Sequence, residues 1–313
     1  MRTTLLSFVF ILYGISLIAQ DKADLKLKLE KNVTYKFKSA SEQTVSQIIN
    51  GIQQNTDVKS NSTISMKMVD MSPEFIIAEF RFDTIMTKTN AMGVSYNINS
   101  ANEGNLKSAN MSDVLSCIMN RFSKNSLYVK LDYAGKIIAI VNSKMLCDII
   151  LKDTSTITGQ MAPMIKTQIN NMVSDNAFKS MVASFTNYLP GKQIATGEKW
   201  EVSLTIHSGG MSLDVITNYT LNGIKENSAN ITAESNIKAS ENAEPMKYSG
   251  AIITYGEITG LSKSNMIVDT RTGLLLESTE KSHITGNLNV TAQAVNMQIP
   301  MEISSNSNVI ALP

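Results

Sequence analysis

Apolar and polar residues alternate along most of this chain, and this pattern limits the possible folds more than any other feature. Val33, Tyr35 and Phe37 alternate with polar neighbours, and the same period recurs around Phe80 and Trp200. A period of two puts successive side chains on opposite faces of a strand. Pro and Gly stand where consecutive strands have to reverse. The pattern therefore predicts a mostly β protein built from antiparallel hairpins.

The middle of the chain has helical spacing instead. Asn110-Met111-Ser112-Asp113 is typical of the start of a short helix that ends near Phe122, and Asn142-Ser143 of a second helix. From about 157 to 189 the apolar residues follow a helical period, with a break near 174–176. The sequence thus predicts helices between two β-rich parts.

The two β-rich parts share an order of features. Each opens with an aromatic strand, at Tyr35 or Trp200, and each closes with an Asp-containing strand and a glycine turn, at Asp132 to Gly135 or Asp269 to Gly273. We interpret this as an ancient duplication, although any meander of strands could give a similar order. The predicted fold class is α+β and mostly β, with curved antiparallel sheet in two similar halves flanking a central helical segment. The predicted boundaries are 1–19 for a signal peptide and 20–313 for one domain, divided into 20–141, 142–191 and 192–313.

The N-terminus resembles a secretory signal. Arg2 is the one charge before Asp21, the stretch from Leu5 to Ile18 is almost wholly apolar, and Ala19 precedes polar sequence. An uncleaved membrane anchor is the alternative, but the stretch is shorter than the ~20 residues of a spanning helix. We expect cleavage after Ala19, and a free protein in the periplasm or outside the cell, without a transmembrane anchor.

Charge and motifs argue against several function classes. Lys and Arg total 28 and Asp and Glu total 27, without a basic cluster, so nucleic acid is not an expected partner. The chain has no nucleophile elbow, phosphate-binding glycine loop or His-Glu-x-x-His motif. His207 and His283 both lie in strand patterns, where structural roles are expected. We expect no cofactor, no metal site and no enzymatic activity.

The two cysteines, Cys117 and Cys147, leave two interpretations open. Export would permit a disulfide between them. Both nevertheless lie in apolar helical patterns, where a cysteine is often a small buried hydrophobic residue.

Methionine is unusually frequent, with 18 residues. Several methionines share the apolar face of the central helical segment with two phenylalanines, and burial of that face in the core is its simpler interpretation. Alternatively, this adaptable face lines a pocket for an apolar or lipid-like ligand. The candidate ligand-binding residues are Met161, Met164, Met172, Phe178, Met181 and Phe185.

Short motifs resemble a known family. Leu189-Pro190-Gly191, Gly197-Glu198-Lys199-Trp200, the Tyr35-x-Phe37 opening and the hairpin at 269–273 are similar to those of DUF6263, a family of exported Bacteroidota proteins without an assigned activity. The resemblance spans most of the mature chain. More loosely, the layout resembles the periplasmic lipoprotein carriers (LolA-like proteins), in which a curved sheet holds helices around a lipid cavity. This second resemblance is one of architecture.

Two main functional hypotheses follow, beside a third, an enzyme, which would need His207 or His283 in a cleft next to a carboxylate or hydroxyl group. The first is a non-enzymatic envelope protein that binds an apolar small molecule or lipid between sheet and helices. The second is a structural or protein–protein interaction module of the periplasm or cell surface that has no ligand cavity and binds another envelope protein.

Overall fold

The computed structural model describes residues 21–159, 162–208, 210–248, 251–292 and 295–313. The predicted signal peptide, its cleavage point and Met161 lie outside the described residues. Within them, no helix combines the length and apolar character needed to span a bilayer.

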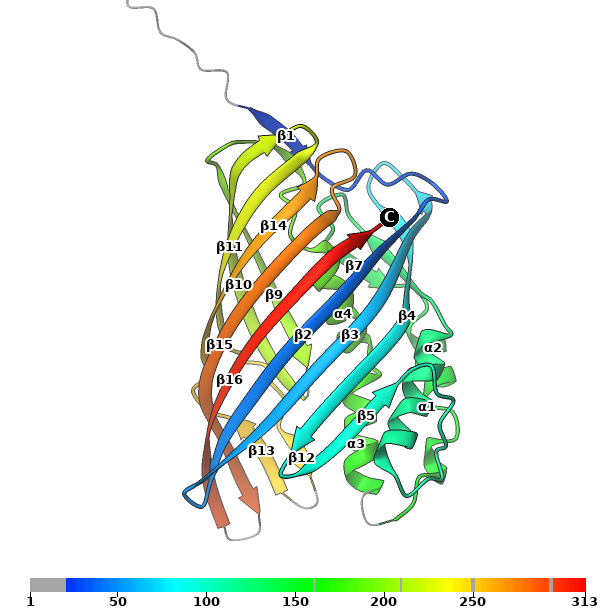
Figure 1. Cartoon of the computed structure of the whole chain (residues 1–313), viewed down its shortest axis with the longest axis vertical. Helices are drawn as coiled ribbons and strands as arrows, with labels where there is room; N and C mark the ends of the chain where they lie inside the picture. Colours follow the sequence, from blue (N-terminus) through cyan, green and yellow to red (C-terminus); the bar gives the residue numbers. More distant parts are fainter. Residues whose placement is uncertain (1–20, 160–161, 209, 249–250, 293–294) are drawn as a thin grey trace, which may run out of the picture.

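Most of the described chain forms one antiparallel sheet of 14 strands (Figure 1). The main path of this sheet runs β7-β6-β4-β3-β2-β16-β15-β14-β11-β10-β9, and the sheet is strongly curved and not closed. Two further strands, β1 and β8, form a small separate sheet. The strands are β1 (Lys22–Leu25), β2 (Thr34–Ile49), β3 (Ile52–Met71), β4 (Ile76–Ala91), β5 (Val94–Asn99), β6 (Leu127–Leu131), β7 (Ile137–Ile140), β8 (Lys192–Ala195), β9 (Lys199–Ser208), β10 (Met211–Lys225), β11 (Ser228–Ala239), β12 (Met246–Tyr248), β13 (Ala251–Tyr255), β14 (Thr259–Asp269), β15 (Leu275–Ala292) and β16 (Val295–Leu312).

The two halves repeat one strand order. In the first half β2, β3, β4, β6 and β7 lie side by side in that order, and in the second β9, β10, β11, β14 and β15 do the same. The glycine turns at Gly135 and Gly273 each join the fourth strand of a half to the fifth. The sequence-based prediction of two similar β-rich halves around helices is therefore confirmed.

The helices of the described chain follow the predicted positions. They are α1 (Met111–Ser123), α2 (Ser143–Ile150), the 3₁₀ turn η1 (Thr154–Thr156), α3 (Ala162–Met172) and α4 (Asp175–Thr186). Helix α1 begins where its sequence predicts, because the Asn110 side chain accepts a hydrogen bond from the backbone N–H of Ser112 at 2.9 Å. Ser174 makes the break between α3 and α4, accepting from the Ala177 N–H at 3.2 Å.

Helix α4 lies between the two edge strands of the open sheet. It contacts β7 at one edge and β9 at the other. At the β9 edge, the backbone N–H of His207 donates to Ser180 Oγ of α4 at 2.8 Å. A helix in this position occupies strand edges that would otherwise offer unpaired backbone groups.

The apolar side chains form two separate cores. The main core joins the helices to one end of the sheet, and Phe80, Leu115 and Phe178 are among its most deeply buried members. A smaller core of Leu213, Ile258, Ile284, Met301 and Ile303 lies elsewhere on the sheet. Packing is therefore not continuous along the sheet.

Candidate functional site

Several residues of the sequence motifs meet at one end of the sheet and form a structural junction. The Tyr188 hydroxyl is buried and donates to the Gly273 carbonyl oxygen at 2.8 Å. The Trp200 indole N–H donates to the Tyr188 carbonyl oxygen at 2.9 Å, and its ring stacks on that of Tyr219 with 5.3 Å between centroids. These motif residues connect the helical segment to the second half of the sheet.

The segment that precedes β2 passes between the two glycine turns. The Leu27 N–H donates to the Tyr133 carbonyl at 2.8 Å and the Lys28 N–H to the Thr272 carbonyl at 2.9 Å. Leu25 and Leu27 are fully buried there. The Asp-containing turns therefore act in folding, as their sequence predicted, by fixing this segment between the two halves.

Arg271 fixes the Asp269 side chain within the β14–β15 turn. The Arg271 guanidinium donates to both carboxylate oxygens, from Nε at 3.1 Å and from Nη2 at 2.8 Å, and the Arg271 backbone N–H donates at 2.9 Å. Burial pushes the pKa of Asp269 upward, but these bonds outweigh it and leave the pKa below its ordinary value. The ionised carboxylate consequently stabilises the folded state.

This shift predicts a pH-dependent contribution to stability. Because the folded-state pKa of Asp269 is lower than the unfolded value of about 3.9, its contribution is complete above that value and is lost as the pH falls through the folded-state pKa. We expect the difference in Tm between the wild type and Asp269→Asn to be largest above about pH 5 and to shrink in more acidic buffer. Thermal melts from about pH 2 to about pH 7 follow the contribution from its loss in acid to its full value. Arg271→Gln removes the guanidinium bonds and charge but keeps the backbone N–H bond, so it should flatten most of the profile. A difference that does not change with pH would contradict this assignment.

The structure separates the predicted ligand-binding residues. Phe178 is fully buried and stacks on Phe122 with 5.6 Å between centroids, so it belongs to the core. Met172 and Met181 are half-buried against the same core, and Met164 is half-buried on α3. Phe185 alone among the described candidates lines a cavity next to α4.

That cavity, with a volume of about 310 Å³, lies between α4 and the sheet. Phe185 and Tyr188 contribute from the helix and the residues that follow it. Apolar side chains also come from the sheet strands, where the lining includes Leu204, Ile206, Val215, Met266, Leu275 and Val309. Part of the wall can therefore receive an apolar group.

The sheet also supplies a polar row to the cavity. Its members are cross-strand neighbours, and all of them line the cavity: Tyr219, Ala233, Ser264, Glu280 and Ser307. We call these five residues the hydroxyl row, because three of them carry a hydroxyl group. Glu280 is the one carboxylate among the described residues that line this cavity. Apolar and hydrogen-bonding surfaces therefore face the same space.

The neighbouring row of the sheet is also rich in hydroxyls. Thr217 and Ser235 hydrogen-bond to each other at 2.9 Å, and both line the cavity. The buried Ser262 donates to Glu280 Oε1 at 2.5 Å. This bond holds the Glu280 carboxylate on the sheet next to the cavity.

Tyr219 is the member of the hydroxyl row that lies on β10. Burial raises the pKa of the Tyr219 hydroxyl to about 12, the Thr217 side chain acts to lower it and the negative charge of Glu280 raises it further. Tyr219 is therefore a neutral hydrogen-bond donor at physiological pH.

The hydroxyl residues of the strands were not predicted as part of a site. Ser262 and Ser264 on β14, and Ser278 and Ser282 on β15, fit ordinary strand alternation. Their even spacing was nevertheless a signal that each strand places its hydroxyls on one face. That Ser264 and Ser278 line one cavity with Phe185 depends on pairings between strands far apart in the sequence, which the chain alone did not specify.

The two cysteines are free thiols. Cys117 is buried in α1, whereas Cys147 in α2 is half-buried and its thiol donates to the Val173 carbonyl oxygen at 3.8 Å. Burial raises the pKa of Cys147, and the nearby Asp148 carboxylate adds to the effect. Both thiols thus have the character of small packing groups, the second of the two interpretations of the sequence.

The histidines lie on separate strands. His207 Nδ1 is 2.9 Å from Ser212 Oγ, and the exposed His283 has its Nδ1 3.2 Å from Ser304 Oγ and 3.7 Å from Glu302 Oε1. Neither histidine lines the cavity beside α4. Among the described residues, no group of three or more His, Cys, Asp and Glu side chains could hold a metal ion.

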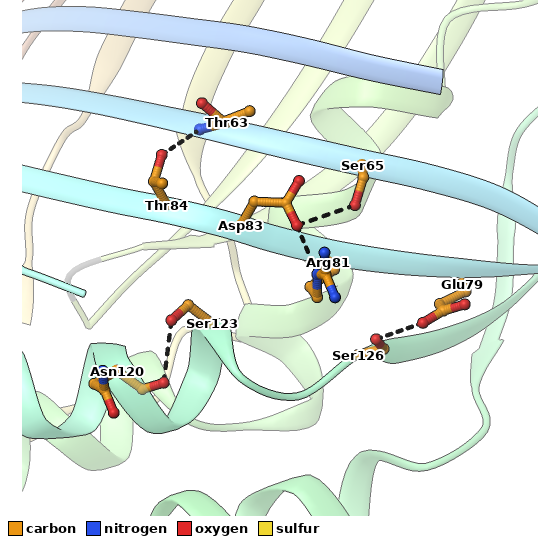
Figure 2. A network of polar contacts seen from close by, with 9 residues as sticks. All are labelled: Thr63, Ser65, Glu79, Arg81, Asp83, Thr84, Asn120, Ser123 and Ser126. Atoms are coloured by element: carbon orange, nitrogen blue, oxygen red, sulfur yellow. Dashed lines mark hydrogen bonds and ion pairs between the residues drawn. The ribbon is translucent and has the colours of Figure 1, made fainter. Parts of the chain in front are cut away.

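A second polar cluster, around Asp83, stabilises an irregularity in β4 (Figure 2). The register between β3 and β4 shifts at this point and leaves Asp83 without a cross-strand partner. Its Oδ1 accepts from Arg81 Nε at 2.6 Å and from Ser65 Oγ at 3.3 Å (Figure 2). Ser126 donates to Glu79 nearby at 2.7 Å. We assign this cluster a structural role, because its polar groups already bond to one another around a β-bulge.

Three solved bacterial protein structures are similar to parts of this chain at 6–8% identity. An outer membrane channel from Pseudomonas putida F1 has a TM-score of 0.27 and 6% identity, with 91% of this chain and 97% of the channel covered. The translocator domain of the autotransporter NalP from Neisseria meningitidis has a TM-score of 0.23 and 6% identity, with 91% and 90% covered. A putative outer membrane lipoprotein-sorting protein domain from Vibrio parahaemolyticus has a TM-score of 0.14 and 8% identity, with 86% and 83% covered.

No curated protein matches the chain. The model of a family of unknown function, DUF6263, matches residues 73–275, which is more than half of the chain. The resemblance found in the short sequence motifs is thereby confirmed.

Proposed function

This chain belongs to the DUF6263 family of unknown function, and we propose that it is an exported, non-enzymatic envelope protein that binds a small amphiphilic molecule between α4 and the sheet. The observation that carries the proposal is the cavity of about 310 Å³ in which apolar side chains face the hydroxyl row. Its volume is at the lower end of the ~300–1,000 Å³ of small-molecule sites. The signal-like N-terminus supports export.

The lining indicates how such a ligand would lie. Its apolar part would contact Phe185, Leu204 and Val215, because these side chains offer no hydrogen bond. Its polar part would bond to the hydroxyl row, which includes Glu280. A site with both surfaces favours an amphiphile over a purely apolar molecule, which would leave the polar groups unsatisfied.

Filling the cavity should strongly weaken ligand binding. We expect Ala183→Phe, which places a ring in the space between α4 and the sheet, to reduce the binding of the fluorescent probe N-phenyl-1-naphthylamine at least about tenfold. Asn176→Phe is the matched control, because Asn176 is exposed on the same helix and does not line the cavity. Fluorescence titration measures binding, and the Tm of each variant shows whether it remains folded.

Two results would contradict the proposal. One is a wild type that does not bind the probe and has the same mass under native and denaturing conditions after purification from its host. The other is equal probe binding by folded Ala183→Phe and Asn176→Phe. A Glu280→Gln variant tests the polar side, because loss of its charge should weaken the binding of cationic amphiphiles selectively.

A protein–protein interaction module is the second candidate, and one surface favours it. Val141, Met145 and Ile149 are 60%, 51% and 37% exposed. Val141 just precedes α2 and the other two lie on it, and their spacing of four residues puts all three on one face. Together with Lys144 and Asp148 they line a shallow surface depression. Failure of the wild type to bind the probe would favour this candidate.

A further inference from the structure

The turns of the sheet differ in charge, and the difference is clearest at two hairpins of the first half. The turns at the end that holds the segment before β2 contain charges such as Glu74, Glu226 and Arg271. At the other end, the β2–β3 hairpin has no Asp, Glu, Lys or Arg from 43 to 56, and the β4–β5 hairpin has none from 89 to 102. Figure 1 shows both hairpins turning at the lower end of the molecule. Neither hairpin segment has a charged side chain of its own to desolvate, although Glu257 and Glu302 line the surface pocket that includes Ile48 and Gln53.

Aliphatic side chains are exposed at both of these turns. Ile48 and Ile52 are 47% and 66% exposed at the β2–β3 turn, and Met92 and Val94 are 75% and 50% exposed at the β4–β5 turn. We call these four residues the apolar tips. Strand β3 pairs with β4, so the two hairpins belong to neighbouring parts of the sheet. Exposed apolar groups at the turns of adjoining hairpins are typical of an interaction surface.

The backbone conformation at Met92 is one that methionine rarely adopts. Both turns have two residues at positive φ, Asn50 and Gly51 in one and Met92 and Gly93 in the other. Asn and Gly suit such turns, whereas methionine is disfavoured in the left-handed conformation. Met92 is also largely exposed to water, so neither the turn nor solvation favours methionine at this position. Burial of the Met92 side chain against a partner would favour methionine at this position.

We propose that the apolar tips insert into the interfacial region of a lipid bilayer and dock this end of the sheet on a membrane surface. The strands on either side of both turns pair in register up to the turn, so the backbone that would enter the interface is hydrogen-bonded within its own hairpin. Asn, Gln, Ser and Thr flank the tips and can hydrogen-bond to lipid headgroups. Because no Lys or Arg lies in either hairpin segment, and the carboxylates of Glu257 and Glu302 line the pocket beside Ile48, the surface suits zwitterionic lipids of zero net charge and not an anionic membrane.

Flotation of residues 20–313 with phosphatidylcholine and phosphatidylethanolamine vesicles tests the proposal. We expect the wild type to float with the vesicles, and the bound fraction to change less than about twofold between about 0.1 and about 0.5 M salt. The double variant Ile52→Glu, Met92→Glu should lower vesicle affinity at least about tenfold, because it brings two charges to the interface. Ile138→Glu is the matched control, because it changes a comparably exposed aliphatic residue, on β7 and away from both hairpins, and should leave flotation unchanged.

A second variant excludes misfolding as the cause. Met92→Asn fits the turn better than methionine, so it should keep or raise the Tm while weakening flotation severalfold. A wild type that does not float, or a double variant that floats equally well, would overturn the proposal. Self-association of a non-floating wild type that Met92→Glu abolishes would assign the tips to a second copy of the chain and also overturn it.

Discussion

Gly273→Ala is expected to destabilise the protein by about 3 kcal/mol, because two costs add at one position. Gly273 has φ +75°, where an L-residue with a Cβ is disfavoured by ~1–2 kcal/mol. A Cβ there would also lie 2.3 Å from the carbonyl oxygen of Lys26, a backbone atom that cannot rotate away. The substitution should therefore displace the segment before β2 from its place between the glycine turns. Chemical denaturation measures the free energy of unfolding.

Gly197→Ala is the matched control for this loss. Gly197 has φ +88°, but a Cβ there would meet nothing within 4 Å. Its alanine variant should therefore lose only the conformational part, about 1 kcal/mol. If the two variants were equally stable, the close packing of Gly273 against Lys26 would not contribute to the junction.

Phe178→Ala should cost about 3–5 kcal/mol, the usual loss for a fully buried phenylalanine. Phe178 is 0% exposed and stacks on Phe122 from α1, which in turn packs on Phe82 of β4 with 5.3 Å between ring centroids. The change would leave a void where α4, α1 and the sheet meet. The unfolding free energy from urea titration tests this expectation.

Phe185→Ala, about two helical turns further along α4, provides the comparison. Phe185 is half-buried and lines the cavity, so its removal should cost about 2 kcal/mol or less. The same variant should weaken probe binding, whereas Phe178→Ala should change stability with less effect on binding. Equal losses of stability would indicate that Phe185 is packed as tightly as Phe178 and would argue against the cavity.

The contrast between these two phenylalanines explains why the candidate site was only partly predictable. The helical period placed Phe178, Met181 and Phe185 on one apolar face, but a single face can meet both a core and a cavity. Phe178 stacks in the core formed with α1, and Phe185 lines the same cavity as the hydroxyl row of the sheet. Periodicity reports which residues share a face, and it does not report what packs against that face.

The sequence by itself determined the local structure. Its alternation produced the strands, Asn110 and Ser174 produced helix starts, and the glycine turns reversed the chain where predicted, because each of these depends on neighbouring residues. Only the tertiary structure decided that α4 lies between β7 and β9 and that Ser264, Glu280 and Phe185 line one cavity. Those positions depend on strand pairings between distant segments, and strand period alone does not specify which strands pair.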